Sequence, residues 1–488
     1  MFDIVLCTIN AKWIHPSLAL RLLKANLPPE FSETRCTILE FALRQPLAEK
    51  INAVLAENPC ILALSVSIWN HKATLELLCA LEAEWAGSKK PAVILGGPEL
   101  TPLPPGAEIF RHADFVIRGE GELVFAELCA DILENPKPAK EKYGRFIEGG
   151  QADTDKIRSA YDLYTKEDLE HKLVYVESSR GCLFNCAFCQ SAAVSAVREF
   201  PLKPFLDDLD RLLQRCPHKT KTVKFLDRSF NIHPDRALEI LEFCLEKIAA
   251  RGKANKSAFQ FHFEMVPSIF PAELGETLAR FPPETLRLEI GIQSLNSKTN
   301  ALINRTCNPE KDLEVLQFLA EKTSAILHVD LIAGLPGEDI ESFANGFDKL
   351  WITLSGIKNN TETKRSPASL LTFPFEIQLG ILKCLPGTPV CDMAKNGRYI
   401  LNRNKEPPYE VIETDCMPAC DLDKLKNFAR FWELLVNRRP FPQLLEQLVP
   451  PGSPVFWLFM DLSQKLLVRF GRNWGIDKKE LEEEIVLN

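Results

Sequence analysis

Over residues 1–135, the pattern of hydrophobic and polar residues switches between that of buried strands and that of amphipathic helices. Short runs of Val, Ile and Leu predict strands, and the segments between them repeat apolar residues with helical spacing, with Pro and Gly at the joints. The predicted strands are Asp3–Thr8, Arg35–Glu40, Ile61–Ser67, Ala92–Gly96 and Asp114–Arg118, and the predicted helices are 17–26, 46–57, 71–85 and 120–133. This order predicts an α/β fold with a parallel, doubly wound sheet of the flavodoxin or Rossmann-like kind, which binds ligands beyond the carboxyl ends of its strands.

The pattern changes after residue 135. Residues 136–171 are rich in Lys, Pro, Gly and Asp, and we interpret them as a linker between domains. From residue 172 the alternation of strand and helix resumes, with predicted strands at 173–178, 222–227, 259–264, 286–293, 326–333 and 376–384. Six such units predict a partial (β/α)6 barrel of the TIM type over residues 172–420, with its active site at the carboxyl ends of the strands. Residues 421–488 lack strand patterns and are expected to form a C-terminal helical cap.

The most informative motif follows the first predicted barrel strand. In Arg180-Gly-Cys-Leu-Phe-Asn-Cys-Ala-Phe-Cys-Gln190, three and then two residues separate Cys182, Cys186 and Cys189. A loop with this spacing supplies three thiolates to a 4Fe–4S cubane, which needs a ligand on each iron. Because the run ends at three cysteines, one iron is left open for a ligand that is not protein.

Two other interpretations of this loop are a structural zinc knuckle and three core cysteines that happen to lie close together. Structural zinc sites usually combine two Cys-x-x-Cys or Cys/His pairs separated by a longer spacer. The sequence contains no second pair of that form. The spacing therefore favours the iron–sulfur cluster.

The composition indicates the class of protein and the cellular compartment. The 488 residues are 46% hydrophobic and 25% charged, as in ordinary globular proteins. No apolar run is long enough to span a membrane, and no basic leader precedes an apolar stretch at the N-terminus. A thiolate-bound cluster requires reducing conditions, so we expect a cytoplasmic protein. The net charge of −8 disfavours a broad contact with nucleic acid.

Polar residues stand at the ends of the predicted barrel strands, where apolar residues would be expected. A buried carboxylate or amide is costly without a partner, so these residues are candidates for contact with a polar ligand. They are Asp227, Glu264, Gln293, Arg305 and Asp330. The alternative is a set of internal salt bridges, for example between Glu264 and Arg305.

The cysteine loop, with Phe188 before its last cysteine, resembles the signature of the radical S-adenosylmethionine (SAM) superfamily. The resemblance implies that the open iron chelates the amino and carboxylate groups of SAM and that Phe188 packs beside the adenine. The order Glu264, Gln293, Arg305 and Asp330 resembles the SAM-binding set of the oxygen-independent coproporphyrinogen oxidase branch. The segment with Asp227, Phe225-Leu-Asp-Arg228, stands where that branch has Gly-Gly-Glu, and it is similar to the segment found in cobalamin-binding members.

A doubly wound domain ahead of the barrel resembles the cobalamin-binding class of this superfamily, and the segment Thr8–Leu20 is similar to a subgroup with a C-terminal helical extension. The motifs that imply cobalamin contact lie at the ends of three predicted strands. Glycine pairs allow the backbone to approach the corrin ring closely, and serine hydroxyls can form hydrogen bonds with the nucleotide tail of cobalamin. The implied residues are Ser65, Ser67, Trp69 and Asn70; Gly96, Gly97, Pro98 and Glu99; and Gly119, Glu120, Gly121 and Glu122.

His15 is the only histidine near the end of the first predicted strand. The Asp-x-His-x-x-Gly motif, which supplies an axial cobalt ligand in other cobalamin enzymes, is missing from the sequence. Neutral imidazole is a competent cobalt ligand. The alternative is that His15 is a helix-entry residue before Pro16 that lies beside the corrin without ligation.

The resemblance implies a class B radical SAM methyltransferase with three cofactors: a 4Fe–4S cluster, SAM and cobalamin. It implies hydrogen abstraction from an unactivated carbon of a small-molecule or peptide substrate, methyl transfer from methylcobalamin, and an electron donor such as flavodoxin or ferredoxin. Other hypotheses are a cobalamin-dependent cyclase or rearrangement enzyme, a non-catalytic cobalamin or SAM sensor, and a tRNA methylthiotransferase. The last is disfavoured because the C-terminal region is acidic and helical. Cys307, close to Arg305, is either a hydrogen donor or an incidental buried cysteine.

Overall fold

The computed structural model describes residues 3–33, 35–87, 89–193, 196–217, 219–253, 258–356, 374–397 and 399–487. The chain forms two compact units. The first comprises Met1–Ser178 with Arg198–Lys221, and the second comprises Ser179–Val197 with Thr222–Asn488. Within the described residues, no helix is both long and apolar enough to cross a membrane.

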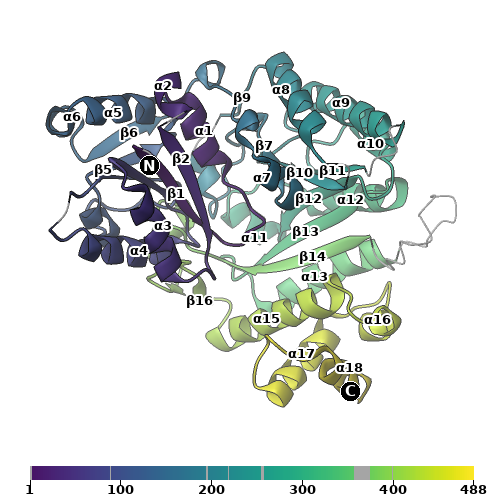
Figure 1. The fold of residues 1–488 in the computed structure, drawn as a ribbon. Helices are drawn as coiled ribbons and strands as arrows, with labels where there is room; N and C mark the ends of the chain where they lie inside the picture. Colours follow the sequence, from purple (N-terminus) through teal and green to yellow (C-terminus); the bar gives the residue numbers. More distant parts are fainter. Residues whose placement is uncertain are drawn as a thin grey trace. The chain divides into compact units, whose positions relative to one another are not determined.

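The first unit contains a parallel six-stranded sheet in the order β2-β1-β3-β4-β5-β6 (Figure 1). Its strands are β1 (Ile4–Asn10), β2 (Cys36–Ala42), β3 (Ile61–Ser65), β4 (Ala92–Gly96), β5 (Phe115–Gly119) and β6 (Phe146–Gly150). Every residue of β1 is buried, as expected for a central strand with helices on both faces. The predicted doubly wound sheet is therefore confirmed.

Helices cover both faces of this sheet. They are α1 (Leu18–Asn26), α2 (Pro29–Ser32), α3 (Leu47–Glu57), α4 (His71–Glu84), α5 (Glu122–Glu134) and α6 (Pro136–Tyr143). The first unit also contains α7 (Lys166–His171) and α8 (Leu202–Arg215). Val5 and Cys7 of β1 belong to the same core cluster as Leu77 of α4, whereas Leu6 belongs to a second cluster with Phe125 of α5. Alternate residues of one strand thus pack on opposite faces of the sheet.

The segment interpreted as a linker, 136–171, contains regular structure. Residues 136–150 form α6 and β6, and β6 adds a sixth strand beside β5. The sequence signal is weak because β6 reads Phe-Ile-Glu-Gly-Gly and has only two apolar residues. A short edge strand needs only one apolar face, so its pattern is easily mistaken for a loop. The short strand β7 (Val174–Val176) also belongs to the first unit.

The second unit contains five of the predicted barrel strands in the order β14-β13-β12-β11-β10. They are β10 (Lys221–Phe225), β11 (Phe259–Met265), β12 (Leu286–Gln293), β13 (Ile326–Ala333) and β14 (Phe375–Ile381), and β11 to β14 pair in parallel. The helices that follow them are α9 (Pro234–Lys253), α10 (Ala272–Ala279), α11 (Ser297–Leu302), α12 (Pro309–Lys322) and α13 (Ile340–Ser355). Buried and half-buried residues alternate strictly along β11, β12 and β13.

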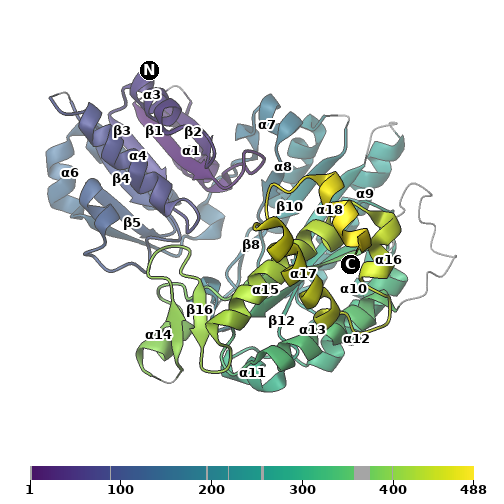
Figure 2. The same cartoon turned by 90° about the horizontal axis from the view of Figure 1, so that it is seen from below.

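After β14 the second unit continues with α14 (Pro389–Lys395) and an antiparallel hairpin of β15 (Leu401–Arg403) and β16 (Val411–Thr414). The sequence pattern did not predict this hairpin. The C-terminal helices are α15 (Ala419–Trp432), α16 (Leu445–Leu448), α17 (Phe456–Phe470) and α18 (Lys478–Leu487). Figure 2 shows α15 and α17 side by side.

The expected C-terminal cap lies on α13 and on the edge strand β14. Phe347 of α13 packs edge-on against Phe428 and Trp432 of α15, with ring centroids 5.2 and 4.8 Å apart. The side chain of Asn437 accepts a hydrogen bond from Ile377 N (3.2 Å) and donates one to Ile377 O (3.0 Å). These bonds satisfy backbone groups of the strand that ends the sheet in the described part of the chain.

A buried carboxyl group closes the turn after β13. In Gly334-Leu-Pro-Gly-Glu338, the Glu338 side chain is buried, and its Oε1 accepts a hydrogen bond of 2.5 Å from the hydroxyl of Ser294. Burial raises the pKa of Glu338 from 4.5 to about 7. Ser294 directly follows β12, so this bond ties the ends of two neighbouring strands together.

The turn after β4 provides a first test of the fold. Gly97 has φ +115°, and a Cβ at this position would lie 2.3 Å from the carbonyl oxygen of Val66. We expect Gly97→Ala to lower the free energy of unfolding by about 3 kcal/mol, because a backbone clash adds to the usual cost of a left-handed residue. Gly87→Ala is the control: Gly87 has φ +85° but no neighbour within 4 Å, so only about 1 kcal/mol should be lost. Equal losses in urea titrations of the two variants would contradict the close approach.

The second test concerns Glu338. Between pH 4.5 and about 7 the folded state holds a proton that the unfolded state releases, so the free energy of unfolding falls as the pH rises through this window. Glu338→Gln removes the ionisation and keeps an acceptor for Ser294. We expect the variant to be about 2–3 kcal/mol more stable than the parent at pH 8, with a much smaller gain at pH 5. A gain of the same size in urea titrations at both pH values would show that Glu338 does not titrate in this way.

Candidate functional site

The cysteine loop is held in the second unit by backbone hydrogen bonds. Ala187, which lies between the second and third cysteines, donates from its N–H to Ile303 O (2.8 Å). Its carbonyl accepts from Val390 N (2.9 Å), and Cys189 N donates to Cys186 O (3.0 Å). The loop is thus fixed from two sides without using a thiol side chain.

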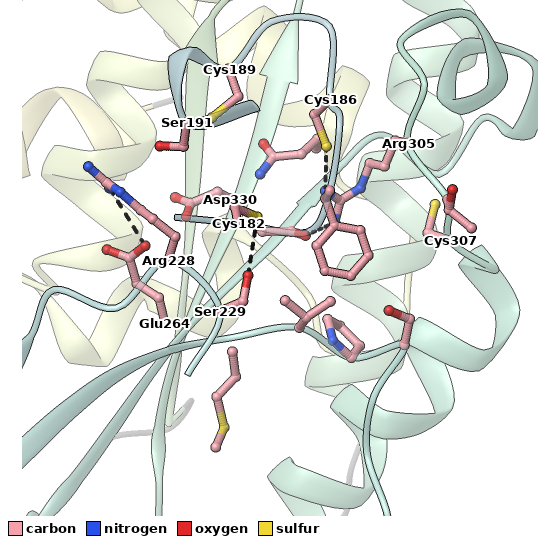
Figure 3. Close-up of a pocket in the computed structure, with 18 of the residues that line it drawn as sticks. Cys182, Cys186, Cys189, Ser191, Arg228, Ser229, Glu264, Arg305, Cys307 and Asp330 are labelled. Atoms are coloured by element: carbon pink, nitrogen blue, oxygen red, sulfur yellow. Dashed lines mark hydrogen bonds and ion pairs between the residues drawn. The ribbon is translucent and has the colours of Figure 1, made fainter. Parts of the chain in front are cut away.

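The three thiols line one cavity of about 240 Å³ at the carboxyl ends of the strands (Figure 3). Cys182, Cys186 and Cys189 contribute to its wall together with Phe188. Among the described residues, no three His, Cys, Asp or Glu side chains converge closely enough to hold a single metal ion. Ligands of a cubane sit on different irons and are therefore spaced more widely than ligands of one ion.

Two contacts polarise the thiols. Arg305 Nη1 lies 3.8 Å from Cys186 Sγ, and Arg305 Nη2 donates to Gly291 O. Burial raises the pKa of Cys186, while the guanidinium of Arg305 opposes that rise. The Ser229 hydroxyl lies 3.4 Å from Cys182 Sγ. A cation beside sulfur favours the charged, thiolate form.

Four of the five predicted strand-end residues meet at this cavity. Glu264 of β11, Gln293 of β12, Arg305 and Asp330 of β13 all line it. They come from separate strands and loops, and parallel pairing brings the strand ends to one edge. The sequence analysis therefore selected residues that the fold brings together.

The polar atoms of this group differ in how well they are satisfied. Glu264 lies 3.6 Å from Lys224 Nζ and 3.8 Å from Arg228 Nη1, and burial raises its pKa although Arg228 opposes the rise. These are the ion pairs of Glu264 within the described residues; the pair with Arg305, which was the alternative to a ligand contact, is not among them. Gln293 Oε1 is buried without a hydrogen-bond partner in the described part of the chain.

Gln293 also has φ +68°, the left-handed region that a residue with a Cβ rarely adopts. Such a conformation costs about 1–3 kcal/mol and persists only where surrounding structure enforces it. An unsatisfied acceptor on a strained backbone, inside a cavity, is the combination expected for a residue that awaits a ligand.

Asp227 does not line this cavity. It is 1% exposed, and its Oδ1 accepts a 2.7 Å hydrogen bond from the Ser179 hydroxyl. The strand β10 ends at Phe225, and the chain beyond it brings Arg228 and Ser229 to the cavity instead. The structure therefore places Asp227 behind the wall of the cavity.

Sequence reasoning missed several residues of this wall. Glu289 is one of them, although Glu289, Gly291 and Gln293 share one face of β12 by simple alternation. Burial alone would raise the pKa of Glu289, but His262 and Lys224 hold it far below its usual value. Cys307, a candidate from the sequence, lies in the same wall. Asp312, Arg228, Ser229 and Ser191 were missed as well. They come from loops and helix starts, where sequence periodicity gives no signal.

A second cavity of about 320 Å³ adjoins the first and shares Phe188, Glu289, Gln293 and Asp330 with it. Its remaining wall comes from β13, β14 and the segment that follows β14. Most of those side chains are apolar, with Gln378 and Lys383 as polar exceptions. An aromatic ring beside an apolar wall is suited to a flat heterocycle.

In the first unit, the predicted cobalamin residues follow β3, β4 and β5 at the carboxyl edge of the sheet. Asn70 is fully buried there and is used internally: its Oδ1 accepts from Ser67 N (2.7 Å) and its Nδ2 donates to Ile9 O (3.0 Å). It therefore fixes the loop after β3 to the end of β1. The remaining residues of this loop and the next are Ser65, Trp69, Gly96, Gly97 and Pro98.

The acidic residues of this edge have partners inside the unit. Glu99 is buried and pairs with His71 Nδ1 at 3.0 Å. Glu120 accepts from Ala152 N (2.9 Å) and from Arg198 Nη1 (3.1 Å). Glu122 begins α5 after Gly119 and Gly121 and is also buried. These carboxylates shape the loops of the edge.

The apolar residues of the edge are exposed. Trp69 after β3 is 51% exposed, and Trp13 and Ile14 after β1 are 50% and 41% exposed. The strands β1 and β3 are neighbours and parallel, so these two loops leave the sheet side by side. Large apolar side chains gathered on a surface usually mark a ligand or partner site.

His15 lies on the same loop as Trp13 and Ile14. Its Nδ1 is 2.5 Å from the hydroxyl oxygen of Tyr175 in β7, and the two rings are stacked with centroids 6.1 Å apart. The sequence analysis left open whether this imidazole is a ligand or a helix-entry residue.

Two family models match the chain. The B12 binding domain matches residues 4–129, and the radical SAM superfamily matches residues 176–350. A curated relative from Pyrococcus horikoshii, the uncharacterized methyltransferase PH0819, is 30% identical over 169 residues, which make up 30% of this chain and 36% of the relative. The chain thus matches only about a third of that relative's length.

Solved structures agree with the family models at the level of the fold. The radical SAM methyltransferase TsrM from Kitasatospora setae, with cobalamin and a 4Fe–4S cluster bound, aligns with a TM-score of 0.64 and 14% identity over 96% of this chain and 100% of that chain. The cobalamin-dependent SAM radical enzyme OxsB, with aqua-cobalamin and SAM bound, aligns with a TM-score of 0.64 and 14% identity over 98% of this chain and 76% of that chain.

The resemblance drawn from the cysteine loop and the strand-end motifs is thereby confirmed. The two matched segments follow one another in the order predicted from the sequence. The chain thus combines a B12 binding domain over residues 4–129 with a radical SAM domain over residues 176–350.

Proposed function

We propose that this protein is a methyltransferase that adds a methyl group to an unactivated carbon of a small-molecule or peptide substrate. The observation that carries the proposal is the single cavity lined by Cys182, Cys186 and Cys189 together with polar residues from three strands. In this proposal the three thiolates hold a 4Fe–4S cluster and leave one iron open. The domain limits 172–420 and 421–488 are part of the same proposal, whereas the sheet of the first domain continues past residue 135 to β6.

SAM fits the unsatisfied chemistry of the cavity. Its ammonium group and ribose hydroxyls are donors, and Gln293 Oε1 is a buried acceptor without a partner among the described residues. The carboxylates of Glu264 and Asp330 line the same space, and Arg305 is a donor suited to a carboxylate. Phe188 lies on the border of the second cavity, where its ring would pack beside the adenine. Asp227, which lies behind the wall, would act through Ser179.

The cofactors supply the difficult chemistry when they are bound: the reduced cluster cleaves SAM to the 5′-deoxyadenosyl radical that abstracts hydrogen, and methylcobalamin supplies the methyl group. The chain's own residues bind and orient the cofactors and shield the reactive carbon from water. Cavity walls of Phe184, Met265 and Val266 keep water away from a reactive carbon. Arg305 places a positive charge beside the thiolate of Cys186.

Cobalamin is assigned to the carboxyl edge of the first unit. The exposed Trp13, Ile14 and Trp69 provide an apolar surface for a corrin ring. Gly96 and Gly97 offer backbone groups without an intervening side chain, and Gly97 has no room for one. Ser65 and Ser67 are hydroxyl candidates for the nucleotide tail, with Pro98 and the 119–122 turn beside them.

The reaction needs an electron from outside the chain, and a flavodoxin or a ferredoxin is the proposed donor. The competing outcome is a radical cyclisation or rearrangement in which no methyl group moves. Product mass separates the two, because only methylation adds one methylene unit.

The first prediction concerns the cluster. Protein reconstituted without air should convert SAM to 5′-deoxyadenosine after reduction, and methyl-labelled SAM should label a product in cell extract. Cys189→Ser should lose at least most of its bound iron and all measurable 5′-deoxyadenosine, because an alcohol is a poor ligand for iron in this cluster. Cys420→Ser is the matched control, since Cys420 is exposed and does not line the cavity. Full activity of Cys189→Ser, or zinc in the purified protein, would contradict the assignment.

The second prediction concerns SAM. Asp330→Asn keeps the size of the side chain but removes its charge, so the dissociation constant for SAM should rise about tenfold or more. Equilibrium dialysis of cluster-loaded protein with labelled SAM measures this constant, and iron content should stay at the level of the parent. Asp392→Asn, on the exposed side of α14, is the control. An unchanged dissociation constant would remove Asp330 from the SAM site.

A further inference from the structure

The outer side of the cysteine loop reaches the protein surface. Leu183 and Asn185, which lie between Cys182 and Cys186 in the chain, are both exposed, and Leu183 is 48% exposed. Cys186 itself is buried. A single apolar side chain at a surface is ordinary, but this one is the direct neighbour of a proposed cluster ligand. At this place an external molecule comes within one residue of Cys182.

Leu183 belongs to a third cavity of about 640 Å³, which we call the outer cavity. Its lining residues come from the cysteine loop and from the end of α11 with the turn that follows. They are Leu183, Phe184, Asn185, Ala301, Asn304, Arg305 and Thr306. Phe184, Arg305 and Thr306 also line the first cavity, which the three thiols share. The outer cavity thus lies on the other side of the wall that faces the proposed cluster.

Hydrogen bonds join the two sides of the outer cavity. Ala187 N donates to Ile303 O (2.8 Å), which ties the cysteine loop to the end of α11. Arg305 N donates to Asn300 O (2.8 Å), and the Arg305 guanidinium lies 3.8 Å from Cys186 Sγ (Figure 3). A partner that docks here meets a preformed surface, so little ordering of the backbone opposes its binding.

The charge of this surface is opposite in sign to that of the whole chain. None of the residues that line the outer cavity is acidic, and Arg305 contributes a guanidinium. Lys298 lies one helical turn before Ala301 on α11, so these two exposed residues share a face of the helix. The chain as a whole has a net charge of −8. An acidic partner is therefore repelled by the chain as a whole and attracted locally at this surface.

We infer that the outer cavity and the adjoining Lys298 form the docking site of an acidic flavodoxin. The inference rests on the proposed function, in which the cluster receives an electron from outside the chain. A flavodoxin exposes the apolar edge of its flavin within a ring of carboxylates. Leu183 and Ala301 contact the flavin edge in this complex, and Lys298 pairs with a carboxylate of the surrounding ring. An apolar hollow fits a projecting ring edge better than the rounded loop that covers the cluster of a ferredoxin.

The electron transfer itself is simple. The anionic hydroquinone of the flavin loses one electron and becomes the neutral semiquinone. The oxidised cluster gains that electron, and no proton or group is transferred. Leu183 and Asn185 belong to the same loop as the thiolate ligands, so the electron enters through the loop that holds the cluster.

The test compares two reductants on the full-length protein, reconstituted with its cluster without air and supplied with SAM. In the first arm, a purified acidic flavodoxin in the hydroquinone state is mixed with the protein, and its semiquinone is followed by stopped-flow absorbance. In the second arm, photoreduced 5-deazariboflavin, a small uncharged reductant that needs no docking site, replaces flavodoxin. The product 5′-deoxyadenosine is measured in both arms.

Lys298→Glu should slow semiquinone formation about fivefold or more at low salt, and the difference should shrink at high salt because ions screen the contact. Lys298→Arg should keep the parental rate. Lys479→Glu is the matched charge reversal at an 84% exposed lysine side chain of α18, and it should also react like the parent. Leu183→Gln should slow the flavodoxin reaction without changing its salt dependence. All four variants should match the parent with 5-deazariboflavin.

Equal flavodoxin rates for the parent and Lys298→Glu at low salt would overturn the inference. Reduction by an acidic ferredoxin but not by flavodoxin would overturn it as well. In both cases 5′-deoxyadenosine formed with 5-deazariboflavin would leave the proposed function intact. If the parent forms no 5′-deoxyadenosine with 5-deazariboflavin, the proposed function itself fails. Iron content equal to that of the parent shows that each variant has kept its cluster.

Discussion

The second unit depends on the strict alternation of side chains along β11, β12 and β13. Each strand sends apolar residues to one face and polar residues to the other, and Phe261, Leu288 and Val329 show the buried positions. The interior of a complete barrel is filled by branched apolar side chains. Here the face shared with the cavity is polar, so its charges must be balanced within the fold.

The balance is achieved by acid–base pairs that run across neighbouring strands. Lys224 Nζ lies 2.7 Å from Glu289 Oε2, and His262 Nε2 lies 3.1 Å from the same oxygen. On the other side, His328 contacts Glu376 at 3.0 Å and Asp330 at 3.4 Å. Burial alone would lower the pKa of His328, but the two carboxylates raise it to about 10. His328 therefore places a positive charge beside Asp330, a carboxylate that lines the cavity.

Local chemistry explains which parts of this arrangement the sequence could predict. The three cysteines and the residues at the ends of β11, β12 and β13 are recognisable because spacing and strand position determine them. Asp227 has the same sequence signature, but the direction of the chain after β10 turns it toward Ser179. No local pattern encodes that turn. The same holds for Asp312, whose place in the wall depends on how the segment after α11 packs.

The first unit shows the same division between local and tertiary information. The alternation of strands and helices predicted its doubly wound sheet, but β6 was missed because two apolar residues give too short a period to detect. The partner of His15 was also beyond reach, since Tyr175 lies 160 residues away in the chain.

The two units therefore present different chemistry to their proposed ligands. At the edge of the first unit, Asn70, Glu99 and Glu120 are engaged in hydrogen bonds that shape the loops. What this edge offers is apolar side chains and glycine backbone. A large, flat ligand is best bound by contact area. The cavity of the second unit instead offers carboxylates, an amide and a guanidinium, which suit a small zwitterion such as SAM. Each site thus has the polarity that its own proposed cofactor requires.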